Sequence, residues 1–328
     1  MGLVVGVDVG GARIAAGLVD ADGRVLIRQT VPTPPRPADL VPCVQKLVSG
    51  FRGGYALSAV GLGVAGFVDR DRSTVLFSSL AGWADLPIGA ELEQLLAIPV
   101  VVENSGSAAA WAEVRFGAGM GESSLVSCVI GTGLGGGFVV DGHPYRGRFG
   151  VAAEYGHIPV VPGGLPCGCG NRGCWQMYAS GAALAREARE LAKAGAEQAK
   201  PLLEKTGGDV DEIGYRVVVA AAREGDPTAV AMVEKLGRWL GTGIATVASV
   251  LDPGRVVIGG GLVAALAGVA VPPDSENLEL LLEPARDEFR RSLPGRGYRR
   301  EASIEPARLG SDAGLIGAAD LARSRFRS

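Results

Sequence analysis

The stretch LVVGVDVGGARIAAGLV, residues 3–19, consists of two apolar runs that flank a pair of glycines. Short Val-rich runs bounded by glycine are typical of buried β-strands. We therefore predict strands over residues 3–7 and 13–19, and a third over 25–31 after the turn Asp20-Ala21-Asp22-Gly23. Two consecutive hairpins would then open a β-sheet.

The first of these turns places Asp8 at a strand end, directly before Gly10 and Gly11. This pattern suits a site for Mg²⁺ and phosphate, because glycine lets backbone N–H groups approach an anion and the acid holds the metal or its waters. A hairpin turn without any chemistry fits the same residues equally well. The turn therefore has two interpretations when taken alone.

Two more glycine turns lie at predicted strand ends. One is Gly131-Thr132-Gly133, and the other is Gly259-Gly260-Gly261, which precedes a helix. The first is not a Walker A motif, since no Gly-Lys-Ser/Thr follows it. The second suits an anion or a flat base, because helix N-termini attract anions. Together, the three turns predict a nucleotide gripped between two domains.

Strand and helix patterns alternate along the rest of the chain, which indicates an α/β protein. We predict strands over residues 57–64, 73–77, 99–103, 124–130, 134–140, 255–258 and 301–305. Helices are predicted near 38–50, 89–97, 180–195, 216–224, 275–292 and 312–325, directly after Asn104, and from Asp226 to about residue 250. With 328 residues, the chain is long enough for two domains. We place a small domain at 1–107 plus 312–328 and a large one at 108–311.

The charge and the hydropathy of the chain indicate which partners it binds and in which cell compartment it works. The formal charge is −3, and the arginines of residues 290–300 are mixed with Glu and Gly, so we expect a solvated face and no nucleic acid. The N-terminus lacks the basic start of a signal peptide. About 18 unbroken apolar residues would be needed for a membrane span, and none occurs. We expect a cytoplasmic protein without a membrane partner.

A cysteine cluster follows a histidine closely. His157 is separated by nine residues from Cys167-Gly168-Cys169-Gly170-Asn171-Arg172-Gly173-Cys174. Three thiolates and one imidazole make a tetrahedral, structural Zn²⁺ site. The alternative is a set of free thiols in a glycine-rich loop. Cys43 and Cys128 lie in apolar contexts and are expected to be inert core thiols.

The same segment, Glu154-Tyr155-Gly156-His157 followed by the cysteines and Trp175-Gln176, resembles the ROK family pattern E-x-G-H-x9-C-x-C-G-x-x-G-C-x-E (repressor, open reading frame, kinase). The resemblance covers nearly the whole chain. It includes Asp8-Val9-Gly10-Gly11, Gly63-Val64-Ala65-Gly66, Gly82-Trp83, Glu103-Asn104, the Gly131 turn, Tyr178-Ala179-Ser180-Gly181 and Leu309-Gly310-Ser311-Asp312-Ala313-Gly314. It implies an actin-like ATPase (ribonuclease H-like) fold with two α/β domains flanking a cleft, and a homodimer or homotetramer.

Residue roles follow from this resemblance. Hexose hydroxyls would be bound by Gly66, Asn104, Glu154, His157 and Gln176. Mg-ATP would be bound by Asp8, Gly10, Gly11, Gly131, Thr132, Gly133, Gly259, Gly260 and Gly261. The implied reaction transfers the γ-phosphate of Mg-ATP to the 6-hydroxyl of a hexose, either glucose or an amino-hexose such as kanosamine. A structural zinc held by His157, Cys167, Cys169 and Cys174 would stiffen the loop that carries Glu154.

The chain departs from the family pattern at four places. Ser105 stands where the family has the aspartate that takes the proton from the 6-hydroxyl, and Gln176 stands where it has glutamate. Ala12-Arg13 replaces Thr-Lys, and Ser78-Ser79-Leu80 lacks a usual asparagine. Serine is not basic near neutral pH, so the alternative function is a pseudokinase that binds sugar or nucleotide as a sensor or scaffold. A family repressor is not expected, because Asp8 leaves no room for a preceding helix-turn-helix domain.

Overall fold

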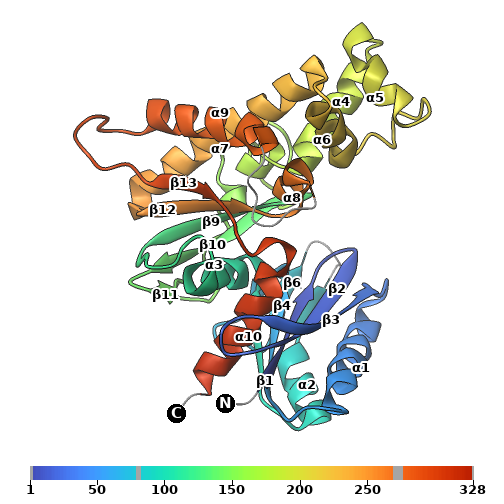
Figure 1. Cartoon of the computed structure of the whole chain (residues 1–328), viewed down its shortest axis with the longest axis vertical. Helices are drawn as coiled ribbons and strands as arrows, with labels where there is room; N and C mark the ends of the chain where they lie inside the picture. The colour runs from blue at the N-terminus through green and yellow to red at the C-terminus, as the bar shows by residue number, and fades with distance from the viewer. Residues whose placement is uncertain (1–2, 79–82, 269–275, 327–328) are drawn as a thin grey trace. The chain divides into compact units, whose positions relative to one another are not determined.

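The computed structural model describes residues 3–78, 83–268 and 276–326 (Figure 1). The chain forms two compact units, one of residues 1–127, 136–153 and 311–328, the other of residues 128–135 and 154–310. This division differs from the predicted domain limits in residues 108–127, 136–153 and 311. Ser79, Leu80 and Gly82 of the sequence motifs, and the predicted helix start at residue 275, lie outside the described residues.

Two five-stranded sheets share one arrangement. The first has the order β3-β2-β1-β4-β8 and the second the order β11-β10-β9-β12-β13. Their strands are β1 (Leu3–Val9), β2 (Arg13–Val19), β3 (Val25–Pro32), β4 (Leu57–Val64), β8 (Val100–Asn104), β9 (Leu125–Ile130), β10 (Leu134–Val140), β11 (His143–Pro144), β12 (Arg255–Gly259) and β13 (Ser303–Pro306). The equal order in both sheets agrees with a duplicated α/β unit.

The first sheet is mixed. β1 pairs antiparallel with β2 and parallel with β4, and β4 pairs parallel with β8. Because side chains alternate along a strand, Val5 and Val7 face one side and Gly6 faces the other. A small three-stranded sheet of β5 (Phe67–Val68), β6 (Val75–Ser78) and β7 (Trp83–Leu86) follows β4 in the chain.

Helices cover both faces of the first sheet (Figure 1). α1 (Leu40–Arg52) and α2 (Ile88–Leu96) pack on the valine side and close the largest core cluster. α10 (Ala313–Arg325) covers the glycine side and packs against α3 (Ser105–Phe116). A Cβ at Gly61 would lie 1.8 Å from the carbonyl oxygen of Ala318, so this face needs glycine for α10 to approach it.

The second unit carries the remaining helices, of which α7 and α9 pack against each other. They are α4 (Gly181–Lys193), α5 (Lys200–Glu204), α6 (Tyr215–Arg223), α7 (Pro227–Leu251), α8 (Gly261–Ala267) and α9 (Glu276–Ser292). The predicted N-cap of α7 is confirmed, since Asp226 Oδ1 accepts from the N–H of Ala229 at 2.7 Å. Within the described residues, every helix is too short or too polar to span a bilayer.

Candidate active site and metal centre

The predicted residues of the first unit gather at the carboxyl ends of β1, β4 and β8. Asp8 on β1 is paired in register with Gly63 on β4, which is paired with Glu103 on β8. Parallel strands end at the same edge of a sheet, so residues far apart in the sequence become neighbours there. Asn104 ends β8, and Ser105 begins α3 directly after it.

Two glycines surround the Asp8 carboxylate. A Cβ at Gly314 would lie 2.9 Å from Cγ of Asp8, and a Cβ at Gly63 would lie 3.5 Å from its Oδ1. The same point at Gly63 is 3.5 Å from Cα of Ser105, so Asp8 and Ser105 flank one small space. Desolvation raises the pKa of Asp8 from 3.8 to about 6, while Arg13 lowers it and Asp312 raises it further.

The turn after β1 forms a closed hairpin. The N–H of Gly10 donates to the carbonyl oxygen of Arg13 at 3.0 Å, and the Thr33 hydroxyl donates to the carbonyl oxygen of Gly10 at 2.7 Å. Gly11 is exposed at its tip. A phosphate contact of Gly10 and Gly11 stays a prediction, with the hairpin as its scaffold.

Asn104 holds two segments together. Its Oδ1 accepts from the N–H of Ser107 at 3.0 Å and thereby caps α3, and its Nδ2 donates to the carbonyl oxygen of Gly66 at 3.0 Å. The Gly66 and Asn104 predicted for sugar binding are thus in direct contact. The amide keeps one N–H and one oxygen lone pair with which to meet a hydroxyl.

Glu103 lies behind this edge and is 1% exposed. Its Oε2 is 3.0 Å from Nε of Arg146 and 3.2 Å from Nε of Arg72, and its Oε1 accepts from the N–H of Asn104 at 2.9 Å. Burial lowers the pKa of Arg72, and Glu103 opposes that shift. A buried carboxylate held by two guanidinium groups fixes the backbone that presents Asn104 and Ser105.

The sequence reasoning missed the two arginines of this ion-pair network. Arg146 also donates to the carbonyl oxygens of Arg70 at 3.0 Å and Asp69 at 2.9 Å. A signal was present, because Glu103 ends the apolar run Val100-Val101-Val102 and a buried carboxylate needs a partner. The sequence offers no way to choose which cations supply it.

In the second unit, the Gly131-Thr132-Gly133 turn is supported by α4. The carbonyl oxygens of Gly131 and Thr132 accept from the N–H groups of Gly181 at 2.9 Å and Ala182 at 3.0 Å. A Cβ at Gly181 would lie 2.5 Å from the Gly131 carbonyl oxygen, so glycine is needed for this contact. Thr132 and Gly133 stay exposed, as a phosphate-binding turn requires.

The third glycine turn starts α8. Gly260 has a φ of 100°, and a Cβ there would lie 2.4 Å from the Ile130 carbonyl oxygen. A side chain at Gly261 would meet the Tyr215 hydroxyl at 3.2 Å. Glycine is therefore needed at position 260, and a base-binding role of this turn at the end of β12 stays a prediction.

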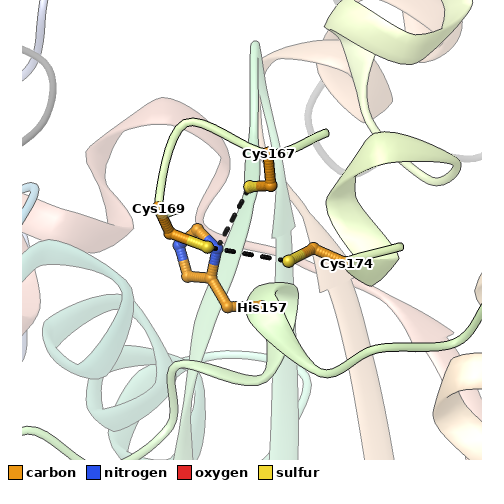
Figure 2. A group of neighbouring side chains, drawn as sticks. All are labelled: His157, Cys167, Cys169 and Cys174. Atoms are coloured by element: carbon orange, nitrogen blue, oxygen red, sulfur yellow. Dashed lines mark hydrogen bonds between the residues drawn. The ribbon is translucent and has the colours of Figure 1, made fainter. Parts of the chain in front are cut away.

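Glu154 directly precedes a short 3₁₀ helix, η2 (Tyr155–His157), and His157 is its last residue. Burial raises the pKa of the Glu154 carboxyl, and the nearby imidazole of His157 opposes the shift. Nδ1 of His157 faces Sγ of Cys167 at 3.6 Å, which leaves Nε2 as the other ring nitrogen (Figure 2). The structure thus brings the predicted sugar-binding acid next to a predicted metal ligand.

The four predicted metal ligands form one cluster (Figure 2). The ligand atoms of His157, Cys167, Cys169 and Cys174 all lie within 4.8 Å of one another. Three sulfurs and one imidazole nitrogen fit Zn²⁺ in a closed, structural site. The pKa of Cys167 is raised by burial but lowered more by hydrogen bonds from Cys169, Gln176 and His157, to about 6. A thiolate, the form that binds zinc, is thereby favoured.

The loop that carries the cysteines is held by backbone hydrogen bonds and by a glycine with positive φ. Gly173 has a φ of 76°, and a Cβ there would lie 1.7 Å from the Val161 carbonyl oxygen. Its N–H donates to the Leu165 carbonyl oxygen at 2.7 Å. The N–H of Cys167 donates to the Asn171 carbonyl oxygen at 2.9 Å, which closes the turn that carries Cys169. The cluster therefore rests on backbone geometry that glycine makes possible.

Gln176 lies beside this cluster, in η3 (Trp175–Met177). Its Nε2 donates to Sγ of Cys167 at 3.2 Å. The sequence reasoning placed this side chain near the anomeric hydroxyl of a sugar, and that contact stays a prediction. Cys128 is fully buried, and burial raises the pKa of its thiol to about 12, as expected of an inert core cysteine.

The protein has the actin-like ATPase fold. Its two sheets have the same strand order, and glycines lie next to the Asp8 carboxylate at the edge of the first sheet. The chain belongs to the ROK family, whose model matches residues 4–325. The predicted family and fold are confirmed.

Known relatives agree with this assignment. The glucokinase of Streptomyces coelicolor is 46% identical over 323 residues, which cover 98% of both chains. The structure of a ROK family glucokinase from Streptomyces griseus, in complex with glucose and AMPPNP, matches with a TM-score of 0.88 and 47% identity, over 98% of this chain and 100% of that one. A ROK hexokinase from Thermus thermophilus matches with a TM-score of 0.76 and 33% identity, over 99% of each chain.

Proposed function

We propose that this protein transfers the γ-phosphate of Mg-ATP to the 6-hydroxyl of a hexose, with glucose as the first candidate and an amino-hexose such as kanosamine as the second. One observation carries the proposal. A glucokinase that is 47% identical along 98% of this chain binds glucose and AMPPNP. The candidate residues Asp8, Asn104, Glu154 and His157 support it, since the chain keeps them all.

In the first unit, Asn104 and the backbone of Gly66 bind sugar hydroxyls. An amide offers both a donor and an acceptor, which suits a hydroxyl that needs each. The hydrogen bond of 3.0 Å between them fixes their relative position before the sugar arrives. Asp8 would hold the Mg²⁺ of Mg-ATP or its waters, and the ion would supply positive charge to neutralise that of the transferred phosphoryl group.

In the second unit, Glu154 accepts hydrogen bonds from sugar hydroxyls, and its raised pKa reflects a site with little water. Gly131, Thr132 and Gly133 offer N–H groups and a hydroxyl to the phosphates. The zinc cluster fixes His157 and, three residues away, Glu154. A zinc ion held by His157, Cys167, Cys169 and Cys174 would be structural, because protein atoms would fill all four positions.

Ser105 supplies no general base. The sugar O6 attacks the γ-phosphorus, the bond from phosphorus to the β,γ-bridging oxygen breaks, and the hydroxyl proton leaves to water. Phosphoryl transfer depends mainly on position and charge, so turnover persists without a base but is slower by about 10²–10⁴-fold. Ser105 also favours a second candidate, a protein that binds sugar and nucleotide as a sensor without turnover.

A coupled assay of ADP release distinguishes a hexose kinase from a sensor without turnover. We expect turnover with one or more of glucose, glucosamine, mannose and kanosamine, measured with Mg-ATP at micromolar enzyme so that slow rates are visible. ADP release without sugar is the blank. Silence with every hexose, together with a sugar- or AMPPNP-dependent rise in melting temperature, would instead establish the sensor. No thermal shift with either ligand would overturn both candidates.

A further inference from the structure

The phenol of Tyr155 joins the two segments of the second unit that carry its candidate ligand-binding groups. Its hydroxyl donates to the carbonyl oxygen of Gly135 at 3.0 Å. Tyr155 directly follows Glu154, the candidate sugar-binding acid, and Gly135 lies two residues after the Gly131–Gly133 turn, the candidate phosphate site. A hydrogen bond therefore runs between these two segments, and no step of the proposed reaction uses it.

The side chain of Tyr155 is fixed inside the protein. It is 2% exposed, and its ring packs against that of Trp175, with 5.8 Å between the ring centroids. Trp175 is itself buried, and its Nε1 donates to the Trp239 carbonyl oxygen at 2.8 Å. Because a phenol is protonated near neutral pH, the hydroxyl has a proton to donate, and the packing of the ring aims it at Gly135.

Tyr155 contacts both strands that lead into the Gly131–Gly133 turn. Gly135 is the second residue of β10, and Cys128, whose thiol is hydrogen-bonded to the Tyr155 side chain, lies in β9. Since the phenol gives its one proton to Gly135, the thiol is the donor to the phenolic oxygen. A movement of the phenol would therefore act on the turn through both of its strands.

The backbone around Tyr155 connects the phenol to the candidate sugar ligands. The N–H of His157 donates to the Glu154 carbonyl oxygen at 3.1 Å, and the N–H of Ile158 donates to that of Tyr155 at 3.0 Å. Glu154, Tyr155 and His157 thus belong to one hydrogen-bonded turn, η2. We propose that Tyr155 is a positioning residue whose hydroxyl couples the hexose held by Glu154 to the nucleotide phosphates held by the Gly131–Gly133 turn.

The coupling is positive, because one ligand orders what the other must order. A hexose bound to Glu154 restricts the turn η2, and through the phenol it restricts the Gly131–Gly133 turn. The nucleotide then loses less conformational entropy when it binds, so its affinity rises. By linkage, the nucleotide raises the affinity for the hexose by the same factor.

The first test measures the affinity for Mg-AMPPNP by calorimetry, with and without a saturating hexose, either glucose or the sugar that gives the largest thermal shift. In the wild type, the hexose should tighten AMPPNP binding by about fivefold or more. In Tyr155→Phe, which keeps the ring and removes only the hydroxyl, the effect should fall below about twofold. Replacing Tyr155 by para-aminophenylalanine restores a donor and should recover the coupling.

The matched control is Tyr178→Phe. It removes a phenol of the same unit that accepts from the N–H of Leu165 at 2.9 Å, away from the Gly131–Gly133 turn. This variant should lose some thermal stability but keep the wild-type coupling. A second readout is amide hydrogen exchange of residues 129–136, which the hexose should slow in the wild type and in Tyr178→Phe but not in Tyr155→Phe.

The inference rests on the ligands of the proposed function, yet the two fail in different ways. A wild type that does not bind both a hexose and AMPPNP refutes the proposed kinase. A wild type that binds the two ligands independently of each other refutes only the coupling. A Tyr155→Phe protein with wild-type coupling, or with the same hexose-dependent slowing of exchange, shows that the Tyr155 hydroxyl contributes to stability alone and overturns its positioning role.

Discussion

Nε of Arg146 lies 3.0 Å from Oε2 of Glu103, and the carboxylate that it pairs with is 1% exposed. The pair sits directly before Asn104 and Ser105, so it controls the backbone on which the candidate sugar site of the first unit depends. Glu103 has a second cation, Arg72, at 3.2 Å. Removing either arginine leaves a buried charge only partly compensated.

Arg146→Met should therefore lower the free energy of unfolding by about 3 kcal/mol, because the carboxylate of Glu103 cannot easily reach water. Chemical denaturation measures this loss. Arg36→Met is the matched control, since Arg36 is 78% exposed beside Asp39 and such surface pairs contribute little to stability. Equal effects of the two substitutions would contradict the role given to Glu103.

Affinity for Mg-AMPPNP should depend on the charge of Asp8. Its pKa is raised to about 6, so the carboxylate is ionised above that pH and takes up a proton below it. We expect binding to weaken by about tenfold per pH unit below about 6. Isothermal titration calorimetry between pH 5 and about 8 measures this, and Asp8→Asn should bind weakly with a flat profile.

The same shift has an opposite effect on stability. The folded state binds the Asp8 proton more tightly than the unfolded chain, whose pKa is near 3.8. This contribution to stability is complete below about 3.8 and is lost as the pH rises through about 6. The difference in unfolding free energy between wild type and Asp8→Asn should follow that curve. A difference independent of pH would show that Asp8 titrates normally.

Metal analysis should find about one zinc per chain, which follows from the single cluster in the described residues. Cys174→Ser should abolish it and lower the melting temperature, because metal binding contributes folding free energy. Cys43→Ala removes a thiol outside the cluster and should retain the metal. Zinc bound equally by both variants would place the ion elsewhere.

Ser105→Asp should raise kcat by about 10²–10⁴-fold and leave the sugar KM within a few fold, because a base acts on the transition state. Aspartate also suits the first turn of α3, where the helix dipole favours negative charge. Ser105→Ala should behave like the wild type. An inactive Ser105→Asp protein that still binds glucose would show that more than a base is missing.

Gly61→Ala should destabilise the first unit strongly, by about 3 kcal/mol or more, since a Cβ there would lie 1.8 Å from the Ala318 carbonyl oxygen. Gly53→Ala is the control. Gly53 has a φ of −62° and open space around it, so alanine should stabilise by about 0.4–1 kcal/mol. Thermal unfolding of the two variants tests the predicted loss of stability in Gly61→Ala and the predicted gain in Gly53→Ala.

The order of elements followed from the sequence to a large extent, for physical reasons. Strand β4 matches the predicted residues 57–64, because its apolar run is bounded by turn residues. The spacing of the cysteines predicted the cluster at His157, since ligands so close in sequence can meet without help from the rest of the fold. The short strands β5 and β7 and helix α5 were missed, because segments of a few residues carry no periodic pattern.

The contacts around the site were less predictable. Arg146 and Glu103 are separated by 43 residues, and only the folded sheet brings them together. The sugar contact of Gln176 stays a prediction, and its hydrogen bond to Cys167 was not predicted, because that contact depends on how the cysteine loop closes. The sequence identified the residue types with chemistry, but their partners depend on tertiary structure.

The close fit of α10 to the glycine side of the first sheet has a consequence for biosynthesis. Strands β1 and β4 emerge from the ribosome early, yet the helix that covers Gly6 and Gly61 is translated after every strand of both sheets. The nascent chain must keep that surface uncovered while the whole second unit is made. Folding of the earliest segment is therefore completed only after α10 has been synthesised, and nascent chains stalled before α10 should be clients for chaperones.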